Sequence, residues 1–512
     1  MRGLRSIFTA IFLGSSLLAT AAERINQDGR ILGPAPVVTA PILFNTTNAD
    51  AVVAAMQIFP VTNPWNEDVS QLPVLTNSTA MMAEIITNFN GIHAYLMTLQ
   101  EMNFVLVPDH QPLVPINFMD VPDESDLNGG ATPDGLYPIP ADLPLESWPG
   151  TGNGSDTNTL YQLQTNSVGD SDAIMVKPGA GYSFETWSTL RVGTHWQAGY
   201  GAIFNLNTNG LRPDGWTSAD AAGLPLFPAV VRYDEAERGM VEHACRLAVH
   251  RYVNGDTYIY PATHTPGGPT GPNYPAMGQR LRLKSTFVIP ANWTIEEKAV
   301  LLGLKKYGAL VADIEDFFAI SITPDNRWPA NCFNDLTSIG ITNFEVVQST
   351  GPDGGPRSPG APVATAGPDQ TVVFGQPAQL AGVVNFSNSP PVIQWTNYSG
   401  PGAVTFGNPS QTNTTANFSA PGVYTLELSA ADGVHAVAYD AVVIMVTNVI
   451  TAALARSGTN VSLSWTGGMA PYTVQQNSSL AAGAWDNLVT TNGNRMILPI
   501  TNTVEFFRVQ GQ

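Results

Sequence analysis

Short alternating runs of apolar and polar residues fill the last third of the chain. Such alternation places one face of a strand in a core and the other face in solvent. Gly, Pro, Asn and Ser, which are typical of turns, separate the runs. The runs cover residues 370–374, 392–395, 424–428, 461–465, 471–475 and 504–509. Their length and spacing predict two small β-sandwich domains.

The residues before position 349 contain few helical patterns. The clearest helix begins at Thr294, which forms a capping box with Glu297, and it ends at Gly308. We expect shorter helices over 79–89 and 217–222. Strands are predicted over 104–108, 173–176, 281–289 and 310–313. This mixture predicts a large β-rich α+β domain.

A segment rich in Gly and Pro, residues 349–362, divides the chain. It has almost no apolar residues and is typical of a linker. We therefore predict a large domain over 23–348 and small domains over 363–448 and 449–512. The predicted fold class is mainly β.

Residues 1–22 have the pattern of a secretory signal peptide. Arg2 and Arg5 are followed by an apolar stretch, 7–18, and by small residues at 19–21. The alternative is a buried N-terminal helix. No later segment has 18 consecutive apolar residues, so we expect an exported protein, secreted or on the cell surface, without a transmembrane segment.

The chain is acidic, with 22 Lys and Arg against 41 Asp and Glu and a net charge of −19. Nucleic acids and anionic membranes bind basic surfaces, so both are excluded as partners. Charged residues make up 12% of the chain, where about 25% is usual. This composition is typical of a secreted, turn-rich β protein. We expect a monomer.

The chain has two cysteines, Cys245 and Cys332. In an oxidising compartment they either pair or remain two separate buried thiols. A disulfide that closes so long a loop would contribute about 4–5 kcal/mol to stability. Two cysteines do not suffice for a Cys-rich zinc site.

The common catalytic motifs G-x-S-x-G, G-K-[ST], H-E-x-x-H and G-x-G-x-x-G before a helix are absent from the sequence. Their absence excludes typical esterases, nucleotide triphosphatases, zincin proteases and Rossmann oxidoreductases. A carboxylate pair near a histidine can still supply a general acid and base, or metal ligands. The candidate catalytic residues are Asp234, Glu235, His243, His264 and Asp313.

Each candidate also has a structural interpretation. Asp234 can pair with Arg232 in a solvated turn, and a single loop histidine is more often structural than catalytic. Asp313 ends an apolar strand, where burial shifts the pKa of a carboxyl group. The alternative for this part of the chain is an Arg–Asp pair that locks a loop.

Aromatic and basic residues on polar loops are candidates for binding a sugar, because an exposed Trp offers a flat apolar platform. The candidate substrate-binding residues are Trp196, Trp216, Arg232, Arg327 and Trp328. The alternative is that the tryptophans are buried and anchor long loops.

One acidic loop has part of a calcium-binding pattern. Oxygen-bearing side chains alternate at Glu124, Asp126 and Asn128, and Gly129 follows. The twelfth position of such a loop is Gly135 here rather than Glu, so the alternative is an acidic surface turn. Calcium is the only cofactor that the sequence suggests.

Two resemblances to known domains concern the small domains. The first rests on residues 366–372, Trp395, 399–402, 418–424 and 431–433. This segment resembles PKD-like domains of bacterial secreted enzymes and surface proteins, which implies a spacer or a weak glycan-binding accessory. Residues 450–512 resemble fibronectin-III-like or Ig-like modules, which implies protection of the terminus, adhesion or surface sorting.

A third resemblance covers most of residues 57–347. It rests on residues 123–126, 201–207, 211–225, 231–235, His243, 261–264, 282–284 and 325–328. In this order they resemble a family of exported bacterial proteins of uncharacterised activity. The resemblance implies one intact domain and carries no catalytic role.

The leading hypothesis is a secreted glycoside hydrolase that acts on an extracellular polysaccharide with two carboxyl groups. The second is a non-catalytic adhesion or glycan-binding protein, and the third a metal-dependent peptidase or lyase. An enzyme should gather His243, His264 and at least two acids in one pocket. A binding protein should show a flat face that bears tryptophans.

Overall fold

The computed structural model describes most of the chain. The described residues are 23–88, 93–150, 159–166, 169–250, 253–387, 389–468, 470–479, 485–499 and 505–511. The predicted signal peptide, residues 1–22, lies outside them. Strands account for 36% and helices for 13% of the residues, which confirms a mainly β fold.

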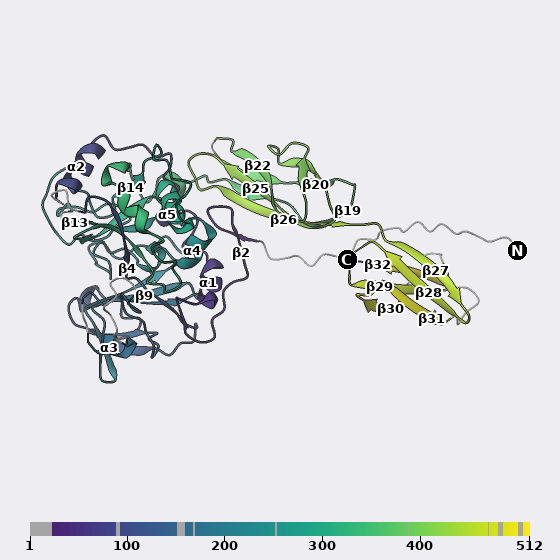
Figure 1. Ribbon diagram of the computed structural model, residues 1–512, viewed down its shortest axis with the longest axis horizontal. Helices are drawn as coiled ribbons and strands as arrows, with labels where there is room; N and C mark the ends of the chain where they lie inside the picture. The colour runs from purple at the N-terminus through teal and green to yellow at the C-terminus, as the bar shows by residue number, and fades with distance from the viewer. Residues whose placement is uncertain are drawn as a thin grey trace. The chain divides into compact units, whose positions relative to one another are not determined.

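The described chain falls into two compact units (Figure 1). One contains Arg24–Pro359 together with Val434–Ala436, and we call Arg24–Pro359 the large unit. The other contains Gly360–Gly433 and Val437–Gln512, which include both small modules.

Four sheets build the large unit. A two-stranded sheet pairs β1 (Arg24–Ile25) with β2 (Ile31–Leu32). A four-stranded sheet has the order β10 (Leu190–Val192), β11 (His195–Ala198), β6 (Val114–Phe118), β7 (Asp134–Tyr137). A five-stranded sheet has the order β12 (Tyr200–Asn205), β9 (Tyr182–Trp187), β8 (Ala173–Lys177), β5 (Val105–Leu106), β3 (Ile42–Leu43).

The largest sheet has six strands and supplies much of the candidate site. Its order is β17 (Phe344–Val346), β14 (Arg280–Leu283), β15 (Ala309–Glu315), β13 (Cys245–His250), β16 (Phe318–Ile322), β4 (Leu96–Gln100). Strands β13 and β15 run parallel, with a bulge that shifts the register between Leu247 and Ala248. Bulges re-aim side chains and are common next to functional sites.

One face of this sheet belongs to the main hydrophobic core. In β13, Cys245, Leu247 and Val249 are core residues. Because side chains alternate along a strand, Arg246 lies on the opposite face. Strand β16 follows the same rule, with Ile320 in the core and Ser321 opposite. The second face is therefore polar although it is buried.

Few helices accompany the sheets, as the sequence predicts. They are α1 (Thr47–Ala54), α2 (Ser78–Asn88), α3 (Leu160–Thr165), α4 (Tyr233–Arg238) and α5 (Ile295–Lys306). Short 3-10 turns cover Pro64–Asn66, Pro122–Glu124, Phe227–Ala229, Asn334–Ser338, Ile341–Asn343 and Gly355–Arg357.

Helix α5 confirms its predicted start. The Thr294 hydroxyl accepts from the Glu297 amide at 3.1 Å, and the Glu297 carboxylate accepts from the Thr294 amide at 3.0 Å. Gly308 follows the helix with φ of +67°, a left-handed conformation that suits glycine. Helix α2 also confirms the predicted helix over 79–89.

Two predicted elements in the large unit are wrong. Residues 217–222 form turns and bends, because the Ser218 hydroxyl bonds to the Asp220 amide and to backbone carbonyls instead of leaving them to a helix. The strand predicted over 281–289 ends at Leu283, since a turn closes from Phe287 N to Lys284 O.

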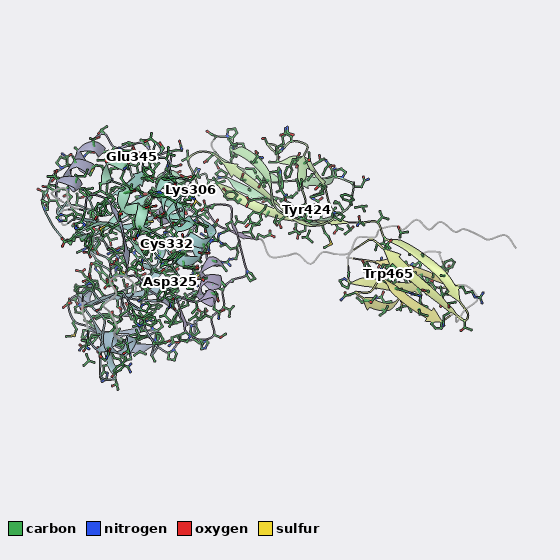
Figure 2. The ribbon with its side chains drawn as sticks, in the orientation of Figure 1. Lys306, Asp325, Cys332, Glu345, Tyr424 and Trp465 are labelled. Atoms are coloured by element: carbon green, nitrogen blue, oxygen red, sulfur yellow. The ribbon has the colours of Figure 1, made fainter. Side chains whose placement is uncertain are left out.

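The first small module has nine strands. They are β18 (Val363–Thr365), β19 (Gln370–Val373), β20 (Ala378–Ala381), β21 (Val383–Asn385), β22 (Val392–Ser399), β23 (Val404–Phe406), β24 (Asn413–Phe418), β25 (Gly422–Ala431) and β26 (Ala438–Thr447). Its main sheets have the orders β19-β26-β25-β22 and β20-β24-β23. Both sheets contribute to one core around Trp395 and Tyr424, the latter labelled in Figure 2.

The described residues of the C-terminal module form six strands in two sheets, β27-β28-β31 and β30-β29-β32. The strands are β27 (Thr451–Ser457), β28 (Asn460–Thr466), β29 (Tyr472–Asn477), β30 (Asp486–Thr491), β31 (Arg495–Pro499) and β32 (Phe506–Gln510). Its core is small, with four buried residues, Leu463, Trp465, Val474 and Leu498.

Cys245 and Cys332 are both buried and do not form a disulfide. Of the two alternatives that the sequence left open, the structure shows two separate thiols. The large unit therefore depends on packing and polar networks rather than on a covalent link.

Candidate functional site

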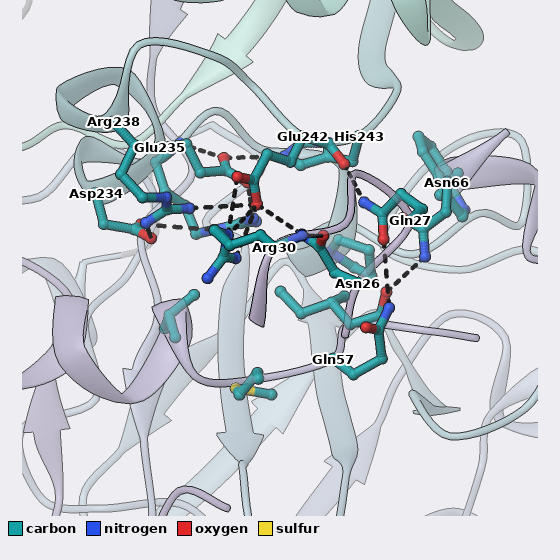
Figure 3. A pocket seen from close by; sticks show the side chains of 16 residues that line it. Asn26, Gln27, Arg30, Gln57, Asn66, Asp234, Glu235, Arg238, Glu242 and His243 are labelled. Atoms are coloured by element: carbon teal, nitrogen blue, oxygen red, sulfur yellow. Dashed lines mark hydrogen bonds and ion pairs between the residues drawn. The ribbon is translucent and has the colours of Figure 1, made fainter. Parts of the chain in front are cut away.

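Three of the predicted catalytic residues line a small pocket with a cavity volume of about 30 Å³. They are Asp234, Glu235 and His243, and His264 and Asp313 do not line it. Figure 3 shows its polar side chains, most of which come from the β1–β2 hairpin, α4 and the loop before β13.

The polar side chains of this pocket form ion pairs. We call the set the Arg232 network: Arg30, Arg232, Asp234, Glu235, Arg238, Glu242 and His243. Arg238 pairs with Asp234 at 2.5 Å, and Arg30 pairs with Glu242 at 2.8 Å. Glu235 accepts from the Arg232 guanidinium and from His243 Nε2, the latter at 3.1 Å. Each of the three carboxylates thus has an arginine partner.

The charges in this network favour a structural role over a role in proton transfer. Burial alone would raise the pKa of Glu235, but Arg232 and His243 outweigh it and hold this pKa at about 2. His243 also donates from Nδ1 to the Ala244 carbonyl at 2.7 Å. Glu235 is therefore a weak base in a closed ion network.

The predicted sugar-binding residues are also buried or bonded to other groups of the protein. Arg232 and Trp196 are buried, at 4% and 6% exposure. Trp216 faces the Arg212 guanidinium, and the indole of Trp328 donates to the Thr323 carbonyl. All ten tryptophans lie within the described residues, and none is exposed. The alternative in which tryptophans anchor loops fits better than a set of sugar platforms.

Arg327 locks a loop. Its guanidinium pairs with Asp325 and Asp50 and lies over the Tyr233 ring at 4.1 Å from the centroid. This arrangement matches the Arg–Asp alternative and leaves the guanidinium engaged within the protein.

The side chains of the acidic loop bond within the protein. Asp126 pairs with Arg212 at 2.5 Å, and Glu124 accepts from the Thr217 amide at 3.2 Å. The Asn128 side chain donates to the Leu136 carbonyl at 2.7 Å, so its nitrogen faces the backbone. Among the described residues, no group of three or more His, Cys, Asp or Glu is placed to hold a metal ion.

Asp313 belongs to a second polar cluster, on the non-core face of the six-stranded sheet. We call it the Arg246 cluster: Glu101, Glu146, Asp170, Asp172, Tyr200, Asp220, Arg246, Asp313 and Glu315. Arg246 comes from β13 and Asp313 from the neighbouring β15. Glu101 directly follows β4. Asp172 directly precedes β8 and Tyr200 begins β12, and both strands belong to the five-stranded sheet. The cluster therefore joins residues from both large sheets.

Arg246 is the centre of this cluster. Its Nε donates to Asp220 at 3.1 Å, its Nη1 donates to Ser321 at 2.9 Å, and its Nη2 pairs with Asp313. Glu101 lies 3.5 Å from Nη1 and accepts from Ser321 at 2.8 Å. The Asp313 and Glu101 side chains keep 19% and 16% of their surface exposed. Solvent thus reaches the carboxyl groups around a buried arginine.

One arginine does not neutralise so many acids. Burial, with the nearby charges of Glu101 and Asp170, raises the pKa of Glu146 to about 8. Burial also raises the pKa of Asp313, although Arg246 and the Ile314 amide favour its charged form. The pKa values of Glu101, Asp172, Asp220 and Glu315 are raised as well, in each case mainly by burial. Carboxyl groups with pKa values shifted by burial and by neighbouring charges make this cluster a candidate functional site.

His264 lies beside this cluster along the backbone. Its Nδ1 donates at 2.7 Å to the carbonyl of Ala221, the residue after Asp220. Its amide donates to Ala222, and the Ala222 amide donates to Ala312, the residue before Asp313. The structure therefore separates the predicted catalytic residues into two groups: Asp234, Glu235 and His243 in one, Asp313 and His264 in the other.

The sequence analysis missed most of the Arg246 cluster. The one local signal is Arg246 itself, a charge within the apolar strand of residues 245–249. A buried arginine requires a carboxylate partner, so this position could have predicted an acid on a neighbouring strand. No such signal marks Glu101, Glu146 or Asp172, which lie in loops far from Arg246 in the sequence.

Residues 366–446 match the family model of a PKD domain, and the first small module is therefore a PKD-like domain. No curated protein matches the chain. Domains of this kind are typical of extracellular adhesion or binding proteins. No helix among the described residues is both long and apolar enough to cross a membrane.

Several solved structures resemble parts of the chain. The PKD domain from KIAA 1837 protein is 22% identical, covers 16% of this chain and 83% of that chain, and has a TM-score of 0.14. The D00-D0 domain of Intimin is 16% identical, covers 28% and 87%, and has a TM-score of 0.19. Immunoglobulin domains 1-4 of Sidekick-1 are 11% identical, cover 38% and 52%, and have a TM-score of 0.20. TM-scores this low support no functional conclusion.

Proposed function

We propose that the protein is an extracellular enzyme whose large unit hydrolyses a glycan at the Arg246 cluster. The observation that carries this proposal is the partly exposed cluster of carboxyl groups around Arg246, in which burial and nearby acids raise the pKa of Glu146 to about 8. Glycoside hydrolysis needs one protonated carboxyl group as a general acid and one carboxylate as nucleophile or base. The proposal keeps the class of reaction expected from the sequence, retains Asp313 and adds Glu146 in place of Asp234 and Glu235.

Glu146 is the candidate general acid. With a pKa of about 8 it holds a proton at neutral pH. Asp313 is the candidate carboxylate, because Arg246 and the Ile314 amide donate to its two oxygens. These two donors favour the ionised form of Asp313 and oppose burial, which raises its pKa.

The experiment compares wild type with Glu146→Gln and Asp313→Asn on a panel of polysaccharides. We expect each variant to lose activity by a factor of about 100 or more, since each removes an acid or base from the reaction. Glu345→Gln is the matched control, because Glu345 pairs with Arg282 outside the cluster. Wild-type rates in both cluster variants, or no hydrolysis of any polysaccharide by the wild type, would refute the proposal.

The second candidate function is non-catalytic adhesion at the cell surface, and the PKD-like domain favours it. In this case the large unit would bind glycan without cleaving it. The lack of exposed tryptophans argues against a flat aromatic binding face. Under either function we propose that the C-terminal module is Ig-like or fibronectin-III-like, and that the exported protein acts as a monomer.

A further inference from the structure

The charges of the Arg246 cluster are strongly unbalanced. Seven of its members are acidic and one is an arginine. Asp220, Asp313, Glu101 and Asp172 all act on the same guanidinium. Neighbouring carboxyl groups of this kind repel one another when ionised. A further positive charge among them would relieve this repulsion.

Two buried oxygens in the cluster point to a hydrogen-bond donor. Asp172 Oδ1 and Asp220 Oδ1 accept no hydrogen bond from the protein, although these residues are only 4% and 0% exposed. Buried carboxylate oxygens are normally satisfied, because an unsatisfied one is costly. The other oxygen of Asp220 binds Arg246, so its unsatisfied oxygen belongs to the centre of the cluster.

The geometry distinguishes between two kinds of cation. A metal ion needs several ligands converging at short distances of about 2.0–2.6 Å, and no group of three suitable side chains among the described residues meets that need. A primary ammonium group needs only acceptors at hydrogen-bond distance, and it brings three donors and one full charge. The cluster suits an ammonium group better than a metal.

We propose that the Arg246 cluster recognises a primary ammonium group on its glycan, so that the substrate class is a polymer with unacetylated amino sugars. This inference rests on the proposed function, because it assigns the ligand to the same cluster. Asp172 and Asp220 each offer an unsatisfied acceptor oxygen to such a group, and Asp313 and Glu101 provide the exposed side of the cluster. Carboxyl groups that hold protons in the free protein would release them when the ammonium group binds.

The test is titration calorimetry of the full chain at 150 mM salt with a glucosamine hexamer and, separately, an N-acetylglucosamine hexamer. We expect the amino hexamer to bind at least about tenfold more tightly, which is the effect of one favourable charge interaction. Heats measured in two buffers with different ionisation enthalpies should show release of protons. Asp172→Asn should weaken the amino hexamer about tenfold or more, and Glu345→Gln should leave its affinity unchanged.

Other outcomes would overturn the inference. Equal affinity for both hexamers, or unchanged binding to Asp172→Asn, would show general attraction to an acidic surface. Binding of calcium alone that Asp172→Asn abolishes would make the cluster a metal site, and preference for a lysine peptide would make the ligand a protein. Asp220→Asn is a second variant, and circular dichroism shows whether each variant folds.

Different results would refute the ammonium inference and the proposed catalytic function. If the enzyme cleaves neutral glycans at the cluster and shows no preference for the amino hexamer, the ammonium inference fails and the proposed function stands. If the amino hexamer binds in an Asp172-dependent way without any hydrolysis, the ligand assignment stands and the catalytic function fails.

Discussion

Glu235 illustrates how a single carboxyl group can look catalytic in a sequence and be structural in a fold. It lies beside Asp234 and eight positions before His243, a pattern that predicts acid–base chemistry. In the fold it is 2% exposed, pairs with Arg232 and His243, and has a pKa held at about 2. Its charge is needed to balance the buried Arg232 guanidinium.

Glu235→Gln should therefore destabilise the protein by about 3–5 kcal/mol, because it removes the closer of the two carboxylates that pair with the buried Arg232 guanidinium. Denaturant unfolding measures this loss. A change below about 1 kcal/mol would show that the Arg232 network is not a buried ion network in solution. The stability that Glu235 provides is present above pH 4.5 and is lost as the pH falls toward 2.

The pH dependence of stability that Glu146 causes should have the opposite sign to that of Glu235. Its pKa rises from an ordinary 4.5 to about 8 in the folded protein, mainly through burial and then through Glu101 and Asp170, while Arg246 opposes the shift. Between these pH values the folded state holds a proton that the unfolded chain releases, so stability falls as the pH rises from 4.5 to 8.

Glu146→Gln removes this titration. We expect the variant to be at least as stable as wild type at pH 8, and its stability to depend less on pH between 5 and 8. Urea unfolding at both pH values checks this. A variant that is less stable than wild type at pH 8 would place Glu146 among the structural residues. Loss of activity without loss of stability is the combination expected of a functional site.

Helix α5 shows how far local patterns determine an element. The capping box at Thr294 and Glu297 is visible in the sequence and present in the fold. By contrast, residues 217–222 have helix-forming alanines but form turns, because Ser218 and tertiary partners satisfy the backbone. A local sequence pattern predicts an element correctly when the hydrogen bonds of that element are also made between nearby residues.

Thr294→Ala should destabilise the large unit by about 1 kcal/mol, since it removes the acceptor of the Glu297 amide. The Thr294 hydroxyl also donates to the Cys332 carbonyl at 2.8 Å, so a tertiary contact is lost as well. Thr294→Ser is the control, because it keeps both hydrogen bonds. Thermal unfolding should rank wild type and serine above alanine, and equal values for all three would contradict the capping role.

At the scale of the whole molecule, each module has a hydrophobic core of its own. The Arg246 cluster and the Arg232 network draw all their residues from the large unit. A fragment of residues 24–359 should therefore unfold cooperatively and keep the activity of the full chain on a soluble oligosaccharide to within about twofold, because no member of the cluster is removed. An inactive but folded fragment would show that the small modules take part in the reaction.

The sequence by itself determined the mainly β class, the PKD-like module and the capped helix, because alternation, turn residues and caps act over a few positions. It also indicated that carboxyl groups of the large unit, Asp313 among them, are candidate catalytic residues. Tertiary structure alone decided which acids meet. Arg246 gathers Glu101, Asp220 and Asp313 from segments more than 200 residues apart, through the order of β15, β13, β16 and β4. Burial and mutual repulsion then set their protonation, and neither exists before the strands pair.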